Sequence, residues 1–187
     1  MLIPFIITTA VCGSSAFHSH VSKGTIPSRG SSRAATPFIQ CGPRVRIVSV
    51  GKTKEPWLVS AIDLYAKRLR PVLELDFVWV KDDAGLLSWT QKITAAQEGL
   101  IILDERGAQC TSVEFAGKVF DGLESGGSRL SIVIGGADGL PPSLKEDSRR
   151  LLSLSRMTFT HQMARLLLVE QIYRATEIRK GSDYHKD

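Results

Sequence analysis

Three short segments in the second half of the chain have residue types that suit the binding of a small molecule. They are Leu103–Gly107, Ile134–Leu140 and Leu154–His161. The second, IGGADGL, contains glycines that let the backbone approach a ligand closely, but its spacing fits neither a dinucleotide fingerprint nor a P-loop. The third mixes small polar and apolar residues and suits the wall of an adenosine-sized pocket. A tight turn and a strand end are the alternative interpretations of the second and third segments.

Residues for nucleophilic or metal-dependent catalysis are sparse. After residue 44 the sequence has two histidines, His161 and His185, and one cysteine, Cys110. It has no GxSxG, HExxH or CxxC spacing, which nucleophilic serines and zinc sites use. We therefore predict no metal site, and nucleophilic catalysis has little support. Carboxylate pairs such as Asp104 and Glu105 are interpreted as acids at strand ends.

Apolar residues along the chain alternate between strand and helix patterns. Strands that alternate with helices predict an α/β fold, with a mostly parallel sheet and helices on both faces. Ligands bind beyond the carboxyl ends of such strands, so the three segments are expected at one edge of the sheet. The expected strands are 46–50, 73–80, 100–103 and 130–134, with 152–159 as strand or loop, and the expected helices are 56–69, 86–97, 111–123, a short one from Pro141, and 161–179.

The helix at 111–123 has a clear start signal. Thr111 and Glu114 have the spacing of a capping box, in which each side chain binds the backbone N–H of the other residue. Its buried face is expected to consist of Val113, Ala116, Val119, Phe120 and Leu123.

Residues 1–44 have the composition of a targeting segment. They contain no Asp or Glu, four basic residues and seven serines. An acid-free, Ser-rich and Arg-bearing leader is typical of an organellar transit peptide. We expect 1–44 to be a transit peptide and 45–187 to be the folded domain, with a chloroplast as the first choice of destination and a mitochondrion as the second. A secretory signal and a disordered tail are the alternatives.

The charge of the chain comes mainly from this leader. The net charge is +5 for the whole sequence, whereas residues 45–187 hold 20 basic and 19 acidic residues. Global charge therefore gives no reason to expect nucleic-acid binding. No apolar run is long enough to span a membrane, since the stretch Leu2–Cys12 is short and contains Pro4.

The last helix has apolar residues around most of its circumference at Leu166–Val169. Such a helix is buried on more than one side, which favours a homodimer interface over a deep position in a monomeric core. Three arginines on this helix are candidates for a basic surface that contacts phosphates; they are Arg165, Arg174 and Arg179. For Arg165 and Arg174, a pair with Glu170 or Glu177 is the alternative.

Together these motifs resemble one enzyme family. The segments IGGADGL at 134–140 and LSLSRMTFTHQMARLLLVEQIYRA at 152–175, with the terminal Tyr184-His185-Lys186, occur in the order and spacing of the RlmH family. That family comprises SPOUT-class methyltransferases that act on N3 of a pseudouridine in large-subunit ribosomal RNA. The resemblance covers essentially all of 45–187.

The resemblance implies an α/β SPOUT fold with a C-terminal trefoil knot, an obligate homodimer, and S-adenosylmethionine (SAM) as cofactor, with large-subunit rRNA or an assembled ribosome as substrate. For catalysis it points to His185 and Tyr184, acting near the cofactor of the neighbouring subunit, with His161 and Arg165 in support. By matching positions, the cofactor-binding residues would be Leu103, Gly135, Leu154, Ser155, Arg156, Met157, Thr158 and Phe159.

Two other functions stay open from the sequence. One is a SPOUT enzyme with a different RNA target, because target choice depends on surface shape. The other is a catalytically inactive ribosome-assembly factor. It is suggested by the segment at 81–99, which is roughly a dozen residues shorter than expected of the family.

Overall fold

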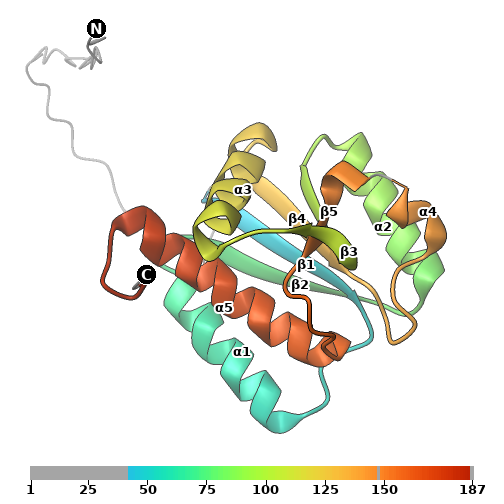
Figure 1. The fold of residues 1–187 in the computed structure, drawn as a ribbon, viewed down its shortest axis with the longest axis horizontal. Coiled ribbons are helices and arrows are strands. Elements are labelled where there is room, and N and C mark those ends of the chain that lie inside the picture. The colour runs from blue at the N-terminus through green and yellow to red at the C-terminus, as the bar shows by residue number, and fades with distance from the viewer. Residues whose placement is uncertain (1–41, 147, 186–187) are drawn as a thin grey trace, which may run out of the picture. The chain divides into compact units, whose positions relative to one another are not determined.

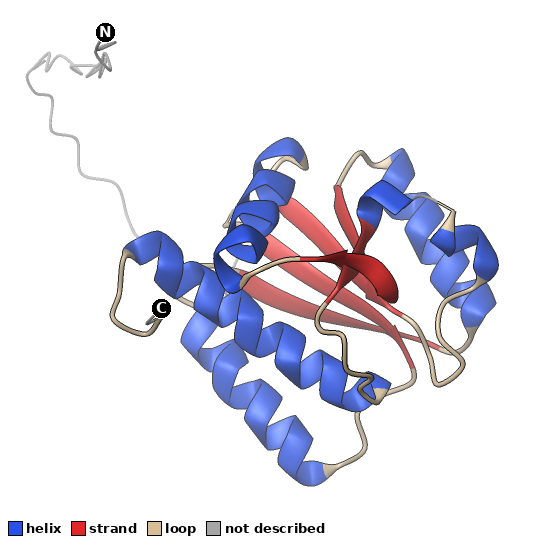
Figure 2. Ribbon diagram, viewed as in Figure 1, coloured by secondary structure: helices blue, strands red, loops and turns tan. Residues whose placement is uncertain are grey.

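In the computed structural model, the chain forms one five-stranded sheet with helices on both faces (Figures 1 and 2). The structure describes residues 42–146 and 148–185. The strands are β1 (Arg44–Val50), β2 (Glu74–Val80), β3 (Gly99–Gln109), β4 (Arg129–Ile134) and β5 (Leu151–Ser153). The helices are α1 (Pro56–Leu69), α2 (Asp83–Ala95), α3 (Ser112–Ser125), α4 (Pro142–Lys145) and α5 (His161–Lys180), with a single 3-10 turn at Ser148–Arg150.

The strands follow the order β2-β1-β4-β3-β5, and every neighbouring pair is parallel. The sequence prediction of a mostly parallel sheet is confirmed. In a parallel sheet all carboxyl ends lie at one edge, which brings the loops after β1, β3, β4 and β5 together there.

Helices α1, α3 and α5 cover one face of the sheet, and α2 and α4 cover the other, with α5 lying between α1 and α3 (Figure 1). The alternation of side chains along each strand explains the two layers. On β1, Val45 and Ile47 pack in the cluster under α1, α3 and α5, whereas Val48 packs under α2 and α4. Helices on both faces were expected and are confirmed.

The helices begin where the sequence places their signals. Pro56 lies in the first turn of α1, and the capping box of Thr111 and Glu114 opens α3. The predicted buried face of α3 is partly wrong. Val113 is 50% exposed, whereas Phe115 is buried in its place, because the burial stripe follows Phe115, Ala116, Val119 and Leu123 around the helix.

Strand β3 is longer than predicted. The apolar run predicts a strand that ends near Leu103 with a loop after it, but the strand continues to Gln109 through an irregularity between Leu103 and Ala108. Residues Ala108 and Gln109 pair with β5 there. At Gly107 a Cβ atom would lie 2.5 Å from the backbone of Leu152, so this approach of the two chains requires glycine.

Some boundaries also differ. Strand β1 begins at Arg44, inside the predicted leader, and α2 spans Asp83–Ala95 rather than 86–97. The rest of the predicted leader, residues 1–41, lies outside the described residues. The C-terminal trefoil knot stays a prediction. Within the described part of the chain, no helix is both long and apolar enough to cross a membrane.

Candidate active site

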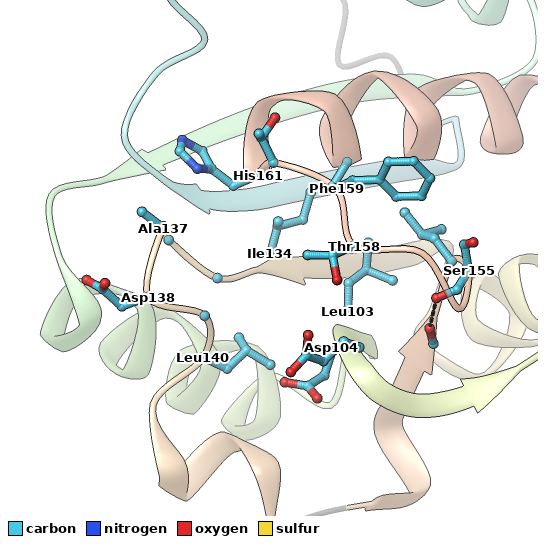
Figure 3. A pocket seen from close by; sticks show the side chains of 18 of the residues that line it. Leu103, Asp104, Ile134, Ala137, Asp138, Leu140, Ser155, Thr158, Phe159 and His161 are labelled. Carbon is cyan, nitrogen blue, oxygen red and sulfur yellow. Dashed lines mark hydrogen bonds between the residues drawn. The ribbon is translucent and has the colours of Figure 1, made fainter.

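A cavity of about 660 Å³ opens at the carboxyl edge of the sheet, where three segments meet (Figure 3). The segments are the middle of β3 around Leu103–Glu105, the loop after β4, and the loop between β5 and α5. They correspond to the three segments singled out in the sequence. The volume lies in the range of small-molecule sites. Its lining includes Leu103, Asp104, Ile134, Gly135, Gly139, Leu140, Lys145, Leu154, Ser155, Met157, Thr158, Phe159, His161 and Gln162.

Seven of the eight residues expected to bind the cofactor line this cavity. They are Leu103, Gly135, Leu154, Ser155, Met157, Thr158 and Phe159. The eighth, Arg156, is not among the lining residues; its Nε donates to Oε1 of Gln109 on β3 at 3.1 Å. The geometry thus brings the expected residues together, with Arg156 bracing the loop against β3.

The glycine loop after β4 is closed on itself. The backbone N–H groups of Gly136 and Gly139 each donate to the carbonyl of the other at 3.2 Å, and Gly139 has φ +87°. Gly135 is buried, and a Cβ atom there would overlap the carbonyl group of Gly139. The sequence argument assigned this glycine to contact with the ligand; the structure shows that the loop itself already excludes a side chain.

The loop from β5 to α5 presents backbone groups to the cavity. Its turn is held by the hydroxyl of Ser153, which donates to the carbonyl of Ser155 at 2.8 Å, and by the N–H of Met157, which donates to Oγ of Ser155 at 3.0 Å. The Met157 side chain is 69% exposed. The side chains of Ser153 and Ser155 therefore fix the backbone of this wall, beside the apolar side chains of Leu154 and Phe159.

Asp104 is a cavity residue for which sequence reasoning proposed no role. Its side chain is 4% exposed, lies 3.6 Å from Nζ of Lys145, and accepts a 2.9 Å hydrogen bond from the N–H of Arg106. The carboxylate and ammonium together leave this side of the cavity without net charge. Its position directly after the apolar run Leu100–Leu103 is the sequence feature that could have identified it as a cavity residue.

His161 begins α5 and lines the cavity (Figure 3). Partial burial lowers the pKa of its imidazole below the ordinary value, and the nearby charge of Arg165 lowers it further. A histidine with a lowered pKa is neutral at physiological pH and can accept a proton. Of the two described histidines, His161 lines the cavity of its own chain and His185 does not.

The prediction that Arg165 contacts phosphates at the surface is wrong, because its side chain lies in the interior of the fold. It is fully buried beneath α5. Its guanidinium donates to the carbonyl oxygens of Val50 and Gly51 at 2.7 and 2.8 Å, and to the hydroxyls of Ser49 and Thr53 at 3.0 Å each. Burial lowers its pKa to about 10, so it stays charged at neutral pH.

The other predicted catalytic residues, Tyr184 and His185, lie beyond the far end of α5. The Tyr184 hydroxyl donates to Glu170 at 3.2 Å, and a nitrogen of His185 lies 3.5 Å from Arg174. Partial burial, a hydrogen bond with Tyr65 and the charge of Glu170 raise the pKa of Tyr184. Tyr184 therefore stays a neutral phenol, and the structure does not bring this pair to the cavity of its own chain.

The remaining arginines of α5 have partners within the chain. Arg174 forms an ion pair of 2.6 Å with Glu170, which was one of the two sequence alternatives. The guanidinium of Arg179 lies 4.1 Å from the centre of the Phe120 ring. Arg174 is therefore neutralised by Glu170, whereas Arg179 is exposed and its place in a basic surface stays a prediction.

Metal and thiol chemistry gain no support from the structure. Among the described residues, no three His, Cys, Asp or Glu side chains are grouped so that they could hold a metal ion. Burial raises the pKa of the Cys110 thiol, which disfavours the nucleophilic thiolate.

The comparisons with known proteins identify the family of this chain. The sequence model of the family described as "Predicted SPOUT methyltransferase" matches residues 44–185. This chain belongs to the SPOUT methyltransferase family. The match confirms two expectations from the sequence, the methyltransferase class and the SPOUT fold.

Two curated relatives of this SPOUT methyltransferase carry the name "Ribosomal RNA large subunit methyltransferase H". The one from Protochlamydia amoebophila is 56% identical over 144 residues, covering 76% of this chain and 99% of the relative. The one from Synechococcus sp. is 44% identical over 146 residues, covering 76% and 95%. The resemblance to this family is thus confirmed. A solved structure of a probable methyltransferase from Bordetella pertussis aligns with a TM-score of 0.45 and 16% identity, over 73% of this chain and 98% of that one.

Proposed function

We propose that this protein transfers a methyl group from SAM to N3 of a pseudouridine in large-subunit rRNA. The observation that carries the proposal is the cavity at the carboxyl edge, which gathers seven residues that the family pattern assigns to the cofactor. The names of the relatives support the class of substrate.

The cavity fits SAM in its chemistry. SAM carries a sulfonium cation and a neutral adenine, so it needs apolar walls and backbone donors rather than a cationic phosphate cradle. Leu103, Leu154 and Phe159 supply apolar walls, and the glycine loop supplies backbone groups. The pair of Asp104 and Lys145 adds no net positive charge to oppose the sulfonium.

The reaction requires the removal of one proton. When bound, SAM supplies an electrophilic methyl group and leaves as S-adenosylhomocysteine. N3 of pseudouridine is a weakly acidic imide, so it gains the methyl group and gives up its proton to a base. The chain's task is to orient N3 toward the cavity and to accept that proton.

Two histidines are candidates for this base. His161 lies in the cavity of its own chain and is neutral at physiological pH. His185 lies at the tail, together with Tyr184. The neutral phenol of Tyr184 can donate a hydrogen bond to a carbonyl of the pseudouridine. We favour the tail pair as the reacting residues, with His161 in support.

The tail reaches a cavity only in a homodimer. Helix α5 starts at the cavity, and the tail folds back so that the Tyr184 hydroxyl binds Glu170, about 14 Å along the helix from its start. Neither Tyr184 nor His185 lines the cavity of its own chain, so the proposal requires a second copy to bring its tail there. The half-buried Leu166 and Leu167 on α5 support an interface on that helix.

We further propose that residues 1–44 direct the protein to a chloroplast, with a mitochondrion as the alternative destination. The support is compositional: the segment has basic residues and serines but no acids. A fusion of residues 1–44 to a fluorescent protein tests this, since a transit peptide would carry the reporter into the organelle and another kind of leader would leave it elsewhere.

The inactive assembly factor loses its main support. The short segment between β2 and β3 folds as α2, with Leu86 and Ile93 buried against the sheet. Thr90 is also buried and its hydroxyl donates to the carbonyl of Leu86. The shorter crossover therefore still covers its face of the sheet.

The direct test uses the full chain, labelled SAM and ribosomes that lack the methyl group. Mass mapping of the rRNA afterwards identifies the product. Methyl on a pseudouridine of the large-subunit RNA is expected. Methyl on another nucleotide would keep the methyltransferase and change its target, whereas SAM binding without transfer would favour the assembly factor.

A further inference from the structure

The loop between β1 and α1 lies at the edge of the cavity. The N–H of Lys54 donates to Oε1 of Gln162 at 2.9 Å, and Gln162 lines the cavity. On the other side, a Cβ atom at the cavity residue Gly136 would lie 3.4 Å from Cβ of Val50. This loop, residues 51–55, therefore contacts the start of α5 at the cavity, and Val50, the strand residue directly before it, lies against the glycine loop.

Two lysines of this loop face solvent. Lys52 and Lys54 are exposed, and neither forms an ion pair within residues 42–146 and 148–185. The loop also contains Glu55, so its net charge is +1. Lysines that stand free beside a site for a polynucleotide substrate suit phosphate groups, which position an RNA without reading its sequence.

The conformation of the loop depends on a buried cation. Gly51 has φ +66°, a left-handed conformation that favours glycine. Its carbonyl and that of Val50 accept from the Arg165 guanidinium, and Thr53 accepts through its hydroxyl. The Arg165 guanidinium lies 4.9 Å from the centre of the Trp79 ring. Arg165 thus joins α5, which forms the cavity wall, to the loop and to β2.

Burial of the Arg165 guanidinium costs desolvation free energy, which its hydrogen bonds and ring contact have to offset. No carboxylate forms an ion pair with Arg165 in the described part of the chain. A buried cation without a carboxylate needs several acceptors and a favourable ring face to offset its desolvation. A hydrophobic side chain would fill the space at lower cost, but it could not hold two consecutive carbonyls of the loop.

We propose that the loop at 51–55 is an RNA-binding element of the site, in which Lys52 and Lys54 contact phosphates of the substrate RNA and Arg165 is a positioning residue for them. The inference rests on the proposed function, because it assigns a substrate-binding surface beside the same cavity. It places the RNA backbone along the side of the cavity formed by α5 and the glycine loop.

The first test compares the double variant Lys52→Gln/Lys54→Gln with the control Lys67→Gln. Lys67 is also an exposed lysine, but it lies in the last turn of α1, about 20 Å along the helix from the loop. Filter binding to purified large-subunit rRNA should show an affinity loss on the order of tenfold for the double variant, with a shallower salt dependence by about 0.7 per lysine. The control should bind as the unaltered protein does.

Kinetics separate RNA binding from the chemistry. In methyl transfer to unmethylated ribosomes, the double variant should raise KM for the ribosome on the order of tenfold while its affinity for SAM, measured by calorimetry, stays the same. A matching loss of SAM affinity, or an rRNA affinity equal to that of Lys67→Gln, would overturn the proposal.

The second test addresses Arg165 through a double-mutant cycle. Arg165→Lys keeps the charge but loses the fork that holds both carbonyls. If Arg165 acts through the lysines, the single variant Arg165→Lys should weaken rRNA binding. The same substitution should weaken binding little further when it is added to the double lysine variant. Fully additive losses would mean that Arg165 has a general structural role and would overturn its assignment. Thr53→Val, which removes one acceptor and leaves the cation, serves in the same cycle if Arg165→Lys does not fold.

These tests remain decisive if the proposed function fails. Filter binding to rRNA requires no turnover, so it measures the lysines even in a protein that methylates another RNA. A lack of methyl transfer by the unaltered protein would contradict the proposed function alone. A lack of rRNA binding by the unaltered protein would contradict this inference.

Discussion

The hydroxyl of Tyr184 donates a 3.2 Å hydrogen bond to the carboxylate of Glu170 and thereby holds the tail on its own helix α5. The Tyr184 ring also meets the Tyr173 ring edge to face, with 4.9 Å between their centres. The residues proposed for proton transfer are therefore anchored against the middle of α5, and neither lines the cavity of its own chain. Under the proposed function, cofactor binding and proton transfer belong to different parts of one chain, so mutation can separate them.

His185→Ala should abolish methyl transfer while leaving SAM affinity unchanged. The imidazole is a candidate base, and it is not among the residues that line the cavity of its own chain, so its loss should leave the walls that hold SAM intact. Transfer to ribosomes and calorimetric titration with SAM measure the two effects. Turnover equal to that of the unaltered protein would exclude His185 as the base and leave His161 as the candidate.

Gly135→Ala should remove SAM binding. The new methyl group overlaps the carbonyl of Gly139, so the glycine loop has to open, at a cost of about 1–3 kcal/mol in unfolding free energy. Gly117→Ala is the matched control, since no atom lies within 4 Å of its added Cβ and it is exposed on α3. The control should gain about 0.5–1 kcal/mol from helix propensity and keep its SAM affinity. Unchanged SAM affinity in Gly135→Ala would show that the loop tolerates the shift.

Asp104→Asn should weaken binding of SAM more than binding of S-adenosylhomocysteine. The change leaves Lys145 without its buried partner, so the cavity gains a positive charge that opposes the sulfonium of SAM and not the neutral sulfur of the product. We expect a loss on the order of tenfold for SAM, which corresponds to about 1.4 kcal/mol. Asp63→Asn on the exposed face of α1 is the control. Equal losses for both ligands would indicate that Asp104 acts through structure rather than charge.

Much of this site could be predicted because its segments follow apolar strands. The loop after β4 and the segment 154–161 were found from glycines and small polar residues directly after a strand, and the parallel sheet brings such segments together. The strand extension at 104–109 could not be found in this way. Its residues are mostly polar, and their pairing depends on β5, which lies far along the chain.

The position of Arg165 was equally inaccessible to sequence patterns. A charged residue on a helix is normally exposed, and its partners Val50 and Gly51 are more than a hundred positions away in the sequence. Two carbonyl oxygens and a ring face leave no pattern of residue types that identifies them as partners for an arginine. The tertiary fold alone brings this cation to the β1–α1 loop.

The pKa of His161 should be measurable as a value below that of an ordinary histidine, by NMR titration of its ring protons. Burial disfavours the imidazolium, and the charge of Arg165 adds to this. The folded state therefore binds this proton less readily than the unfolded state, whose histidine titrates near about 6.5. The stability that the folded state gains from keeping His161 neutral is fully present above that pH, and it is lost as the pH falls through the pKa of the folded state. In His161→Gln, the fall of unfolding free energy over this range should be smaller; an unaltered pH dependence would contradict the assignment.

Mixed dimers test whether the tail acts in the neighbouring subunit. Gly135→Ala removes the cofactor site from one chain, and His185→Ala removes the proposed base from the other, so each variant alone should be inactive. When the two are co-expressed with different affinity tags and the mixed dimer is purified, one intact cavity meets one intact tail. If the tail of one subunit serves the cavity of the other, the mixed dimer regains about half of the activity of the unaltered dimer. If each tail served its own cavity, both sites of the mixed dimer would stay incomplete and it would remain inactive.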